Sequence, residues 1–451
     1  MTKDTGREAV ARSEFFRRTG ALGIAGAAVL GFPLLETRSA SAGPLGPARD
    51  VIAAGGGATV KLGCVDSFSG VFAAAGASHE SGMRLAIAEA EKKNSRIKYS
   101  LITGDDAGKP AVATIEAKRL IAQERVDTLT GAVSSAVGLA VSSLCQENGV
   151  LFIAVGTHDT NITGAKANRV CFRACPDNAM LANAVGPALL KEGKKWYFIV
   201  ADYAFGNDAH ERLRRILLSH GGVESGFDLH PLGATEFSPY MIKARNTDAQ
   251  VIVFCNYGGD LQNASKAVVE FGLQKKMKVG GIAGGNEFAG GMPVDDLVGA
   301  TFGLDWGWDA GGRSKQLYDK LKLVANGFPP NWSQYYGYIT VEQIIDRMNA
   351  VGNTNAEALV NAFEDHRFDA YKGQPSAWRK CDHQNVQEVY AARILPKSKR
   401  PSEGDVFGIF ARVGGDFAAG SCSNADSVKA AAAITSQTIR TRSDYQVVKL
   451  K

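Results

Sequence analysis

The stretch 59-TVKLGCV-65, followed by 81-SGMRLAIAEAEKK-93, sets the pattern that decides the fold. The first segment is short and mostly apolar, as expected of a buried strand, and the second spaces its apolar residues as a helix does. We expect the apolar face of this helix to be formed by Met83, Leu85, Ile87, Ala88 and Ala90. A strand that leads into an amphipathic helix is the repeating unit of an α/β fold.

The same alternation continues along the chain. Further strand-like runs are 99-YSLIT-103, 127-DTLTGAV-133, 151-LFIAVG-156, 195-KWYFIV-200, 249-AQVIVFC-255 and 278-KVGGIA-283. Because these runs are nearly all apolar and most are separated by helix-like segments, they indicate parallel sheets covered by helices on both faces. A chain of 451 residues, 45% of them hydrophobic, is long enough for two cores. The sequence therefore predicts two doubly wound α/β lobes with parallel central sheets.

Residues 1–42 have the composition of an export signal peptide. A basic start precedes the glycine-rich apolar run 19-TGALGIAGAAVLGFPLL-35, and 40-ASA-42 places small residues at both cleavage positions. The apolar run is too short to span a bilayer. We therefore expect an exported, periplasmic chain.

The export route is open from the sequence. The segment 12-RSEFFRR-18 resembles the twin-arginine export motif, but Ser13 stands where the second arginine belongs. Both the twin-arginine route and the general secretory route remain compatible with this signal.

The distribution of charge and the spacing of the cysteines argue against a nucleic acid partner and against a metal site. The net charge of +5 is spread along the chain without a basic block, so nucleic acid is not an expected partner. Cys381 and Cys422 lie in polar, loop-rich sequence and are the pair that we expect to form a disulfide if any does. Cys171 and Cys175 have no second cysteine or histidine pair at zinc spacing, so no metal site is expected.

Small polar residues follow several predicted strands, at the edge of the sheet where α/β proteins bind ligands. Ser134 and Ser135 follow one strand, and Thr157 follows the next. Hydroxyl groups beside the N–H groups of a helix N-terminus suit an anion, although a serine there can also simply cap the helix. The spacing is not that of a nucleophile elbow, and no phosphate-binding or dinucleotide-binding motif is present, so we expect neither catalytic residues nor a cofactor.

Several segments in this order resemble the type I periplasmic solute-binding proteins of the branched-chain amino acid and amide ABC transporters, the Leu/Ile/Val-binding protein-like family. The segments are 66-DSFSGVFAAAGASHESGMRLAIAEA-90, 131-GAVSS-135, 151-LFIAVGT-157, 198-FIVADYAFGND-208, 235-TEFSPYMIKARNTDAQVIVFCNYGGD-260 and 378-WRKCDHQNVQEVYAARI-394. The resemblance implies two lobes joined by three crossovers, a small ligand held between them, and a membrane ABC permease as partner. It also implies a monomer without enzymatic activity.

The resemblance also implies which residues hold the ligand. The ligand-binding residues carried over are Ser134, Ser135, Gly156 and Thr157 for a carboxylate, Tyr203 and Phe205 as closing aromatics, Asn256 and Tyr257 after a later strand, and Phe72 as a pocket lining. Either Asn286 or Glu287 falls where amino acid binders place an acid against the ligand's ammonium group, and the sequence leaves the choice open.

The resemblance places the lobes as well. It predicts lobe 1 at residues 58–176 and 306–374, and lobe 2 at residues 177–305 and 375–451, the latter with a C-terminal extension from residue 397.

Two other functions are compatible with parts of the pattern. A ligand-sensing regulator can use the same fold, although export fits it poorly, and an exported serine hydrolase would use the strand-end serines.

Overall fold

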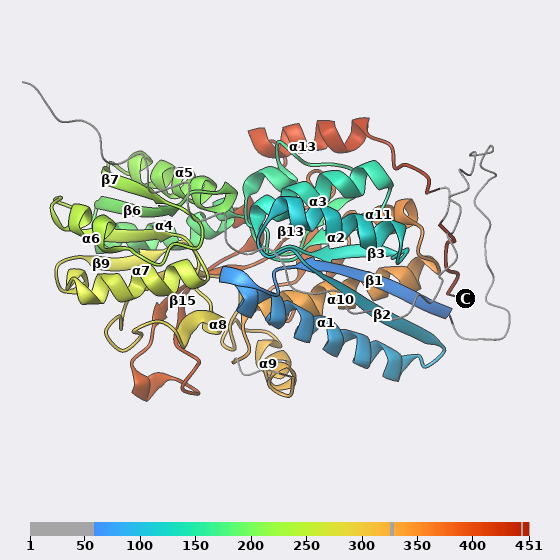
Figure 1. Ribbon diagram of the computed structural model, residues 1–451, viewed down its shortest axis with the longest axis horizontal. Helices are drawn as coiled ribbons and strands as arrows, with labels where there is room; N and C mark the ends of the chain where they lie inside the picture. The colour runs from blue at the N-terminus through green and yellow to red at the C-terminus, as the bar shows by residue number, and fades with distance from the viewer. Residues whose placement is uncertain (1–57, 325–328, 443–444, 451) are drawn as a thin grey trace, which may run out of the picture. The chain divides into compact units, whose positions relative to one another are not determined.

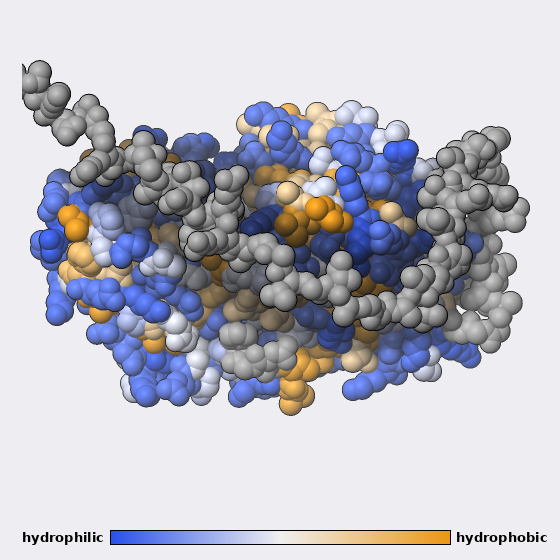
Figure 2. Space-filling view, viewed as in Figure 1, coloured by the Kyte–Doolittle hydropathy of each residue, from blue (hydrophilic) through white to orange (hydrophobic). Residues whose placement is uncertain are grey.

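The computed structural model describes residues 58–324, 329–442 and 445–450. The export signal expected at residues 1–42 lies outside this range. Within it, no helix combines the length and the apolar character needed to cross a membrane. On the face drawn in Figure 2, the described residues are mainly hydrophilic, with hydrophobic residues in small separate patches.

The first sheet has five parallel strands in the order β2-β1-β3-β4-β5. The strands are β1 (Ala58–Asp66), β2 (Ile97–Asp105), β3 (Thr128–Gly131), β4 (Leu151–Ala154) and β5 (Cys171–Arg173). Helices associated with it are α1 (Ala73–Lys93), α2 (Pro110–Ala122), α3 (Ser135–Asn148), α10 (Trp332–Val351) and α11 (Ala356–Phe363). The order places β1, β3 and β4 side by side, which matters for the site.

The second sheet has seven strands in the order β15-β14-β10-β9-β8-β6-β7, and Figure 1 labels β6, β7 and β9 among them. The strands are β6 (Lys195–Ala201), β7 (Val223–His230), β8 (Val251–Cys255), β9 (Lys278–Gly281), β10 (Thr301–Leu304), β14 (Val389–Ile394) and β15 (Phe407–Val413). Five of them are parallel, and β14 and β15 add an antiparallel edge. The helices along this part of the chain are α4 (Asn178–Glu192), α5 (Ala204–Ser219), α6 (Ser238–Arg245), α7 (Gly259–Glu270) and α8 (Asn286–Ala289). The predicted fold of two doubly wound α/β lobes is confirmed.

Shorter elements connect these layers. They are α9 (Ser314–Lys322), α12 (Gly415–Ala419), α13 (Ala425–Ser436), the short helices η1 (Gly70–Phe72), η2 (Thr160–Thr163), η3 (Leu273–Lys275) and η4 (Lys397–Lys399), and a small antiparallel sheet of β11 (Arg367–Phe368), β12 (Ser376–Trp378) and β13 (Asn385–Val386).

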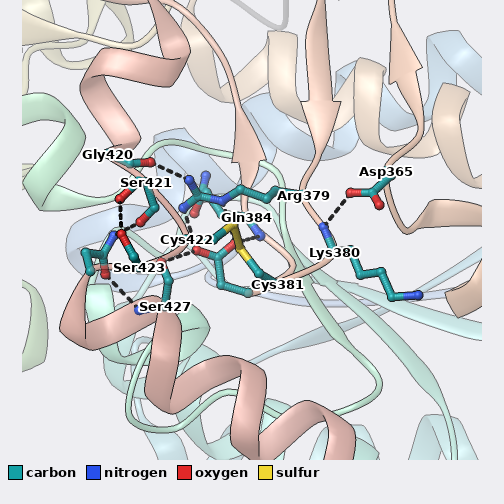
Figure 3. The surroundings of a disulfide bond; sticks show 12 residues. Asp365, Arg379, Lys380, Cys381, Gln384, Gly420, Ser421, Cys422, Ser423 and Ser427 are labelled. Carbon is teal, nitrogen blue, oxygen red and sulfur yellow. Dashed lines mark hydrogen bonds and ion pairs between the residues drawn. A yellow bond between two sulfur atoms is a disulfide. The ribbon is translucent and has the colours of Figure 1, made fainter.

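A disulfide joins Cys381 to Cys422, the pair expected from the sequence (Figure 3). Polar contacts surround it: Arg379 donates to the Asp382 carboxylate and to the Gly420 carbonyl. Ser427, at the start of α13, donates to the same Asp382 carboxylate at 2.8 Å. The bridge and these contacts attach the chain around residues 420–427 to the segment at residues 379–382.

The C-terminal extension returns to the first sheet's side of the chain. Arg442 donates to the Val126 carbonyl at 2.9 Å, Tyr445 donates to the Asp127 carboxylate, and α13 contacts η2. We expected residues 375–451 to belong to lobe 2 throughout. The strands β14 and β15 do lie in the second sheet, whereas Arg442 and Tyr445 hydrogen-bond to residues 126 and 127 and α13 contacts η2. The lobe boundaries themselves remain predictions.

Helices α1 and α10 pack at unusually short range, because glycines lie at their crossing (Figure 1). A Cβ atom on Gly82 would lie 2.0 Å from the carbonyl oxygen of Gln334, and one on Gly337 would lie 2.0 Å from that of His79. The buried face of α1 is therefore made of small and polar residues: Ala75, Gly76, Ser78, His79, Ser81, Gly82, Met83 and Ala86. Of the predicted apolar face, Met83 is buried and Leu85, Ile87 and Ala90 are half-buried and pack against the core, whereas the prediction was wrong at Ala88, which is exposed.

We predict that Gly82→Ala lowers the free energy of unfolding by about 1 to 3 kcal/mol, because the new methyl group has no room between the two helices. Gly290→Ala is the matched control, since no described heavy atom lies within 4 Å of its new Cβ. Urea denaturation of both variants measures the difference. Equal stabilities would contradict this account of the crossing.

Candidate functional site

The carboxyl ends of three neighbouring strands meet at one edge of the first sheet. Val65 pairs with Gly131, and Gly131 pairs with Ala154, so the loops after β1, β3 and β4 start at the same level. These loops carry Asp66, Ser134 and Gly156. The topology therefore brings together the strand-end residues that the sequence singled out.

The two adjacent serines have different environments. Ser134 is fully buried at the position before α3, and its hydroxyl neither caps the helix nor has any other hydrogen-bond partner among the described residues. The Ser135 hydroxyl accepts a hydrogen bond from the Asp159 amide at 3.2 Å. Thr157 donates to the Ala132 carbonyl at 2.8 Å. Of the three predicted hydroxyls, Ser134 is the one without any partner among the described residues, while Ser135 still has an O–H hydrogen to donate.

His79, which the sequence analysis did not select, lies beside Asp66 and Gly156 at the same strand ends. Its Nδ1 is 2.7 Å from Asp66 Oδ2, while Asp66 Oδ1 accepts the amides of Ser67 and Val133. A Cβ on Gly156 would lie 3.1 Å from His79 Cε1, 3.4 Å from its Nε2 and 3.0 Å from the Val133 Cα. Within the part of the chain that the structure describes, His79 Nε2 is buried without a partner.

Glu287 contributes a carboxylate from the second-sheet lobe. Its Oε1 accepts hydrogen bonds from Tyr257 and Ser333, both at 2.6 Å, and its Oε2 is buried with no partner in the described chain. Burial raises the pKa of Glu287, and the hydrogen bonds from Ser333 and Tyr257 oppose that rise.

Asn286 makes different contacts from its neighbour Glu287. Its side-chain oxygen accepts the Val406 amide at 3.3 Å, and its nitrogen contacts the Asp405 carboxylate at 3.4 Å. Asn286 thus holds the segment that leads into β15. Of the two alternatives left open by the sequence, the geometry favours Glu287 as the residue that faces a ligand.

Aromatic rings connect these polar groups. The Trp332 ring centroid lies 6.1 Å from that of His79, 5.2 Å from that of His158 and 5.4 Å from that of Tyr257. The Phe205 ring meets His158 edge-on at 6.0 Å. Trp332 therefore stands between the histidine side and the Glu287 side of the site.

The remaining predicted residues of the site include Phe72, Tyr203 and Asn256. Phe72 is buried and contacts Tyr203 at a centroid distance of 6.1 Å, and Tyr203 lies 5.9 Å from Phe205. Asn256 Nδ2 contacts His230 Nε2 at 3.1 Å, and its Oδ1 is buried without a partner in the described residues. The Phe72–Tyr203 contact thus joins the first-sheet lobe to the second, while the Asn256–His230 contact lies within the second-sheet lobe.

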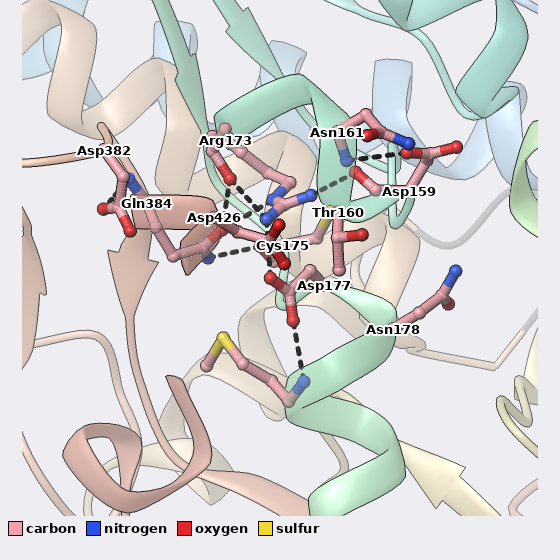
Figure 4. Close-up of polar contacts among 12 residues, drawn as sticks. Asp159, Thr160, Asn161, Arg173, Cys175, Asp177, Asn178, Asp382, Gln384 and Asp426 are labelled. Atoms are coloured by element: carbon pink, nitrogen blue, oxygen red, sulfur yellow. Dashed lines mark hydrogen bonds and ion pairs between the residues drawn. The ribbon is translucent and has the colours of Figure 1, made fainter. Parts of the chain in front are cut away.

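Buried side chains join the segment at the first predicted lobe boundary, residues 176/177, to the segment that follows the third, residues 374/375. Arg173 donates to Gln384 and to the Asp159 carbonyl, both at 2.6 Å (Figure 4). Gln384 in turn donates to the Cys175 carbonyl at 2.9 Å. Because the Asp159 amide bonds to Ser135, this network also fixes the loop that follows β4.

Lys372, just before the predicted lobe boundary at residues 374/375, bonds to the segment at the boundary at residues 305/306. Its Nζ donates to the carbonyls of Asp305 and Glu388 at 2.6 and 3.0 Å and to Gln387 Oε1 at 2.8 Å. Burial lowers the pKa of Lys372 to about 7, while the carboxylates of Asp305 and Glu388 act to raise it.

A cavity of about 380 Å³ lies elsewhere, between α1, α10 and the 366–371 segment. None of the predicted site residues lines it. Glu342, one of its carboxylates, already accepts hydrogen bonds from Tyr338 and Tyr371, and Glu89 pairs with Lys320. The strand-end cluster, with its unpaired buried atoms, is the better candidate for a ligand site.

The sequence analysis missed His79, Trp332 and Ser333. The first lies within a segment quoted for the family resemblance, but it was placed on a helix whose apolar side was expected elsewhere. The other two begin α10, far along the chain from the strand-end loops. The sequence around Trp332 and Ser333 gives no sign that they lie near the strand-end loops, because it is the crossing of α1 and α10 that places them there.

Comparisons with known proteins agree with this fold. The sequence profile of the family described as Periplasmic binding protein matches residues 59–400. Leu/Ile/Val-binding protein homolog 2 of Brucella abortus is 26% identical over 356 residues, which cover 72% of this chain and 91% of the homolog. Leu/Ile/Val-binding protein homolog 7 of Brucella suis is 25% identical over 74% of this chain and 88% of the homolog.

Solved structures share the architecture. A periplasmic binding protein from Burkholderia mallei superposes with a TM-score of 0.75 at 24% identity, covering 80% of this chain and 96% of the other. A solute-binding protein of an ABC transporter from Rhodopseudomonas palustris, in complex with 3,4-dihydroxybenzoic acid, gives 0.71 at 21% identity, covering 79% and 98%.

We predict opposite stability effects at the two serines. Ser135→Ala should lower the free energy of unfolding by about 1 to 3 kcal/mol, because it leaves the buried Asp159 amide without its acceptor. Ser134→Ala removes no hydrogen bond and should leave the free energy of unfolding unchanged or slightly higher. Urea denaturation of both variants without ligand measures this. Equal losses would show that Ser134 is a structural cap after all.

We also predict a pH effect from Asp106, which accepts hydrogen bonds from Ser67 and Gly108. Burial, and then the neighbouring Asp66 carboxylate, raise the pKa of Asp106 to about 7. The folded protein thus binds this proton more tightly than the unfolded chain, so the contribution is fully present below about pH 4 and is lost as the pH rises through about 7. Asp106→Asn should remove this part of the pH dependence in urea denaturation. An unchanged slope between pH 4 and 8 would contradict the assignment.

Proposed function

Because the chain belongs to the periplasmic binding protein family, we propose that it captures one small amino acid, amide or carboxylate ligand between its two lobes and delivers it to a membrane ABC permease. The family and fold predicted from the sequence are confirmed by the profile match and the structural neighbours. The observation that carries the proposal is the set of buried, unpaired atoms contributed by both lobes.

One end of the proposed ligand is an anion. The Ser134 hydroxyl is available at the N-terminus of α3, where unpaired N–H groups and the helix dipole favour negative charge. Gly156 keeps the adjacent surface free of a side chain. This arrangement supports a carboxylate at the edge of the first sheet, as the family resemblance implies.

The other end of the ligand carries a hydrogen-bond donor. Tyr257 and Ser333 both donate to Glu287 Oε1, which leaves Oε2 as the acceptor that faces the site. An ammonium group or a phenolic hydroxyl would satisfy it. The aromatic rings of Trp332, Tyr257 and Phe205 suit an apolar or aromatic body between the two ends.

Contacts between the lobes support closure over the ligand. The Asp208 carboxylate, on α5 of the second lobe, accepts hydrogen bonds from the amide and hydroxyl of Thr160 at 3.0 and 2.6 Å. The Asn178 side chain donates to the same carboxylate at 2.9 Å. The Thr160–Asp208 bonds join the two lobes, and a ligand that contacts both lobes would add to them and shift the balance toward the closed form.

The remaining parts of the proposal follow from the sequence and the family. We propose a periplasmic location after removal of residues 1–42, a monomer as the working form, no nucleic acid partner and no catalytic activity. The relatives bear the name Leu/Ile/Val-binding protein, and one structural neighbour holds 3,4-dihydroxybenzoic acid, so aliphatic amino acids and aromatic acids are the first ligands to try.

A serine hydrolase is the alternative that a specific observation favours. Asp66, His79 and Ser134 are the residue types of a catalytic triad, and the Asp66–His79 contact is made. However, Ser134 Oγ and His79 Nε2 are each unpaired in the described chain, so the nucleophile and the base are not hydrogen-bonded to one another. Turnover of p-nitrophenyl esters that is lost in Ser134→Ala would overturn the binding proposal.

We predict that a member of a panel of aliphatic amino acids, aromatic acids and their amides raises the melting temperature, with a dissociation constant near 1 μM, about 8 kcal/mol. Glu287→Gln should weaken the binding of an amino acid ligand by at least about tenfold, or about 1.4 kcal/mol, because it removes a charge from a charge-assisted hydrogen bond. Thermal shift and titration calorimetry measure both quantities. A panel without any stabilising compound would refute the proposed function.

A further inference from the structure

We propose that the cavity between α1, α10 and residues 366–371 is a second ligand site, and that it binds a small organic ammonium ion beside the Glu342 carboxylate. The proposal goes beyond the proposed function and does not depend on it, because the cavity shares no lining residue with the strand-end site. Its lining residue Glu89 lies about 15 Å further along the axis of α1 than His79.

The cavity has the size of a small-molecule site. Its volume of about 380 Å³ falls within the range of about 300 to 1,000 Å³ that is common for ligand pockets. Ala86 and Ala90 line it from α1 with small side chains, and Tyr338 and Tyr371 line it with aromatic ones. A ligand with a small apolar body therefore has both room and surface to contact.

Glu342 has hydrogen-bond donors around it but no counter-ion. Tyr371 and Tyr338 donate to its Oε1 at 2.7 and 3.3 Å, and within the described chain its Oε2 has no partner and neither oxygen takes part in an ion pair. Burial raises the pKa of Glu342, although the tyrosine bonds and the charges of Lys93 and Lys320 oppose that rise. A cation in the cavity would supply the missing counter-ion.

Carboxylates outnumber cations in the lining of the cavity. The carboxylates are those of Glu89, Glu342, Asp346 and Asp369, and the side chains that stay positively charged at neutral pH are Lys93 and Arg313. Arg313 pairs with Asp369 at 3.0 Å, while Lys320 and Arg347, from outside the lining, pair with Glu89 and Asp346. The lining thus favours a cation over an anion, with Glu342 as the carboxylate left to receive it.

Gln343 gives an independent indication that the cavity receives a ligand. Its side chain lines the cavity and is 5% exposed, and its Oε1 is buried without a hydrogen-bond partner among the described residues. Leaving a buried acceptor unsatisfied is costly, so such an atom indicates a place where another molecule binds. Because Glu342 and Gln343 both offer acceptors, the cavity lacks a hydrogen-bond donor, which an ammonium group provides.

The tyrosine rings beside Glu342 already attract cations of the chain itself. The Arg313 guanidinium lies 4.4 Å from the Tyr371 ring centroid, and Lys320 Nζ lies 5.9 Å from that of Tyr338. The two rings meet edge-on with their centroids 5.9 Å apart. In the part of the chain that the structure describes, no group of three or more His, Cys, Asp or Glu side chains could hold a metal ion, so an organic cation is the class that fits.

The test uses the full chain and three probes of similar shape: benzylammonium, benzyl alcohol and benzoate. Glu342→Gln removes the charge and keeps an acceptor for the two tyrosines. Glu357→Gln is the control, because Glu357 is an exposed carboxylate on α11 that does not line the cavity. Glu287→Gln removes the carboxylate of the strand-end site and so distinguishes the two sites.

We expect calorimetry to show that the unmodified protein binds benzylammonium at least about tenfold more tightly than benzyl alcohol or benzoate. Glu342→Gln should weaken benzylammonium binding by at least about tenfold, because a charge-assisted hydrogen bond is lost, whereas Glu357→Gln and Glu287→Gln should leave it unchanged. Benzylammonium should also slow the exchange of amide hydrogens in residues 338–349 and 366–371.

The inference would be overturned if benzylammonium did not bind, if it bound no better than benzyl alcohol, or if Glu342→Gln bound it as tightly as the unmodified protein. A loss of binding in Glu287→Gln alone, or slowed exchange confined to residues 131–135 and 284–289, would place the cation at the strand-end site and also overturn it. Each of these results leaves the proposed function standing, because the panel of acids, amino acids and amides tests that function separately. Should Glu342→Gln fail to fold, the preference for benzylammonium and the hydrogen exchange of the unmodified protein decide.

Discussion

Three atoms that are buried without hydrogen-bond partners in the described chain, Ser134 Oγ, His79 Nε2 and Glu287 Oε2, are the constraint on which the account depends. Leaving a buried donor or acceptor unsatisfied costs about 1 to 3 kcal/mol, and more for a charged group. The cost is tolerable at a place where another molecule supplies the missing partners. That the three atoms come from both lobes explains why one ligand would draw the lobes together.

The crossover segments show how such movement is compatible with a stable fold. Each lobe has its own central sheet, and the chain between them is held by side-chain amides of Gln384 and Gln387, which donate to the backbone carbonyls of residues 175 and 174. Lys372 adds bonds from its flexible side chain to Asp305 and Glu388. Side-chain contacts of this kind can adjust while a few backbone dihedral angles change, as hinge closure requires.

The fold could be predicted from the sequence, and so could the strand-end loops on which the candidate site is built. Alternating apolar strands and helices indicated two parallel-sheet lobes, and the topology rule directed attention to the loops that carry Ser134 and Gly156. The sequence analysis did not identify His79 and Trp332, because their proximity depends on Gly82 and Gly337, which let two helices distant in sequence cross closely. An apolar-face rule looks only for large apolar side chains, and α1 buries glycines, serines and His79 as well as Met83.

The most direct test is a crystal structure of the full chain grown with the acid from the ligand panel that raises the melting temperature most. The account predicts the carboxylate of that acid within hydrogen-bond distance, about 2.7 to 3.2 Å, of Ser134 Oγ. It also predicts the donor end of the acid on Glu287 Oε2. An acid bound in the cavity between α1 and α10, or bound with Ser134 and His79 still unpaired, would contradict the central claim.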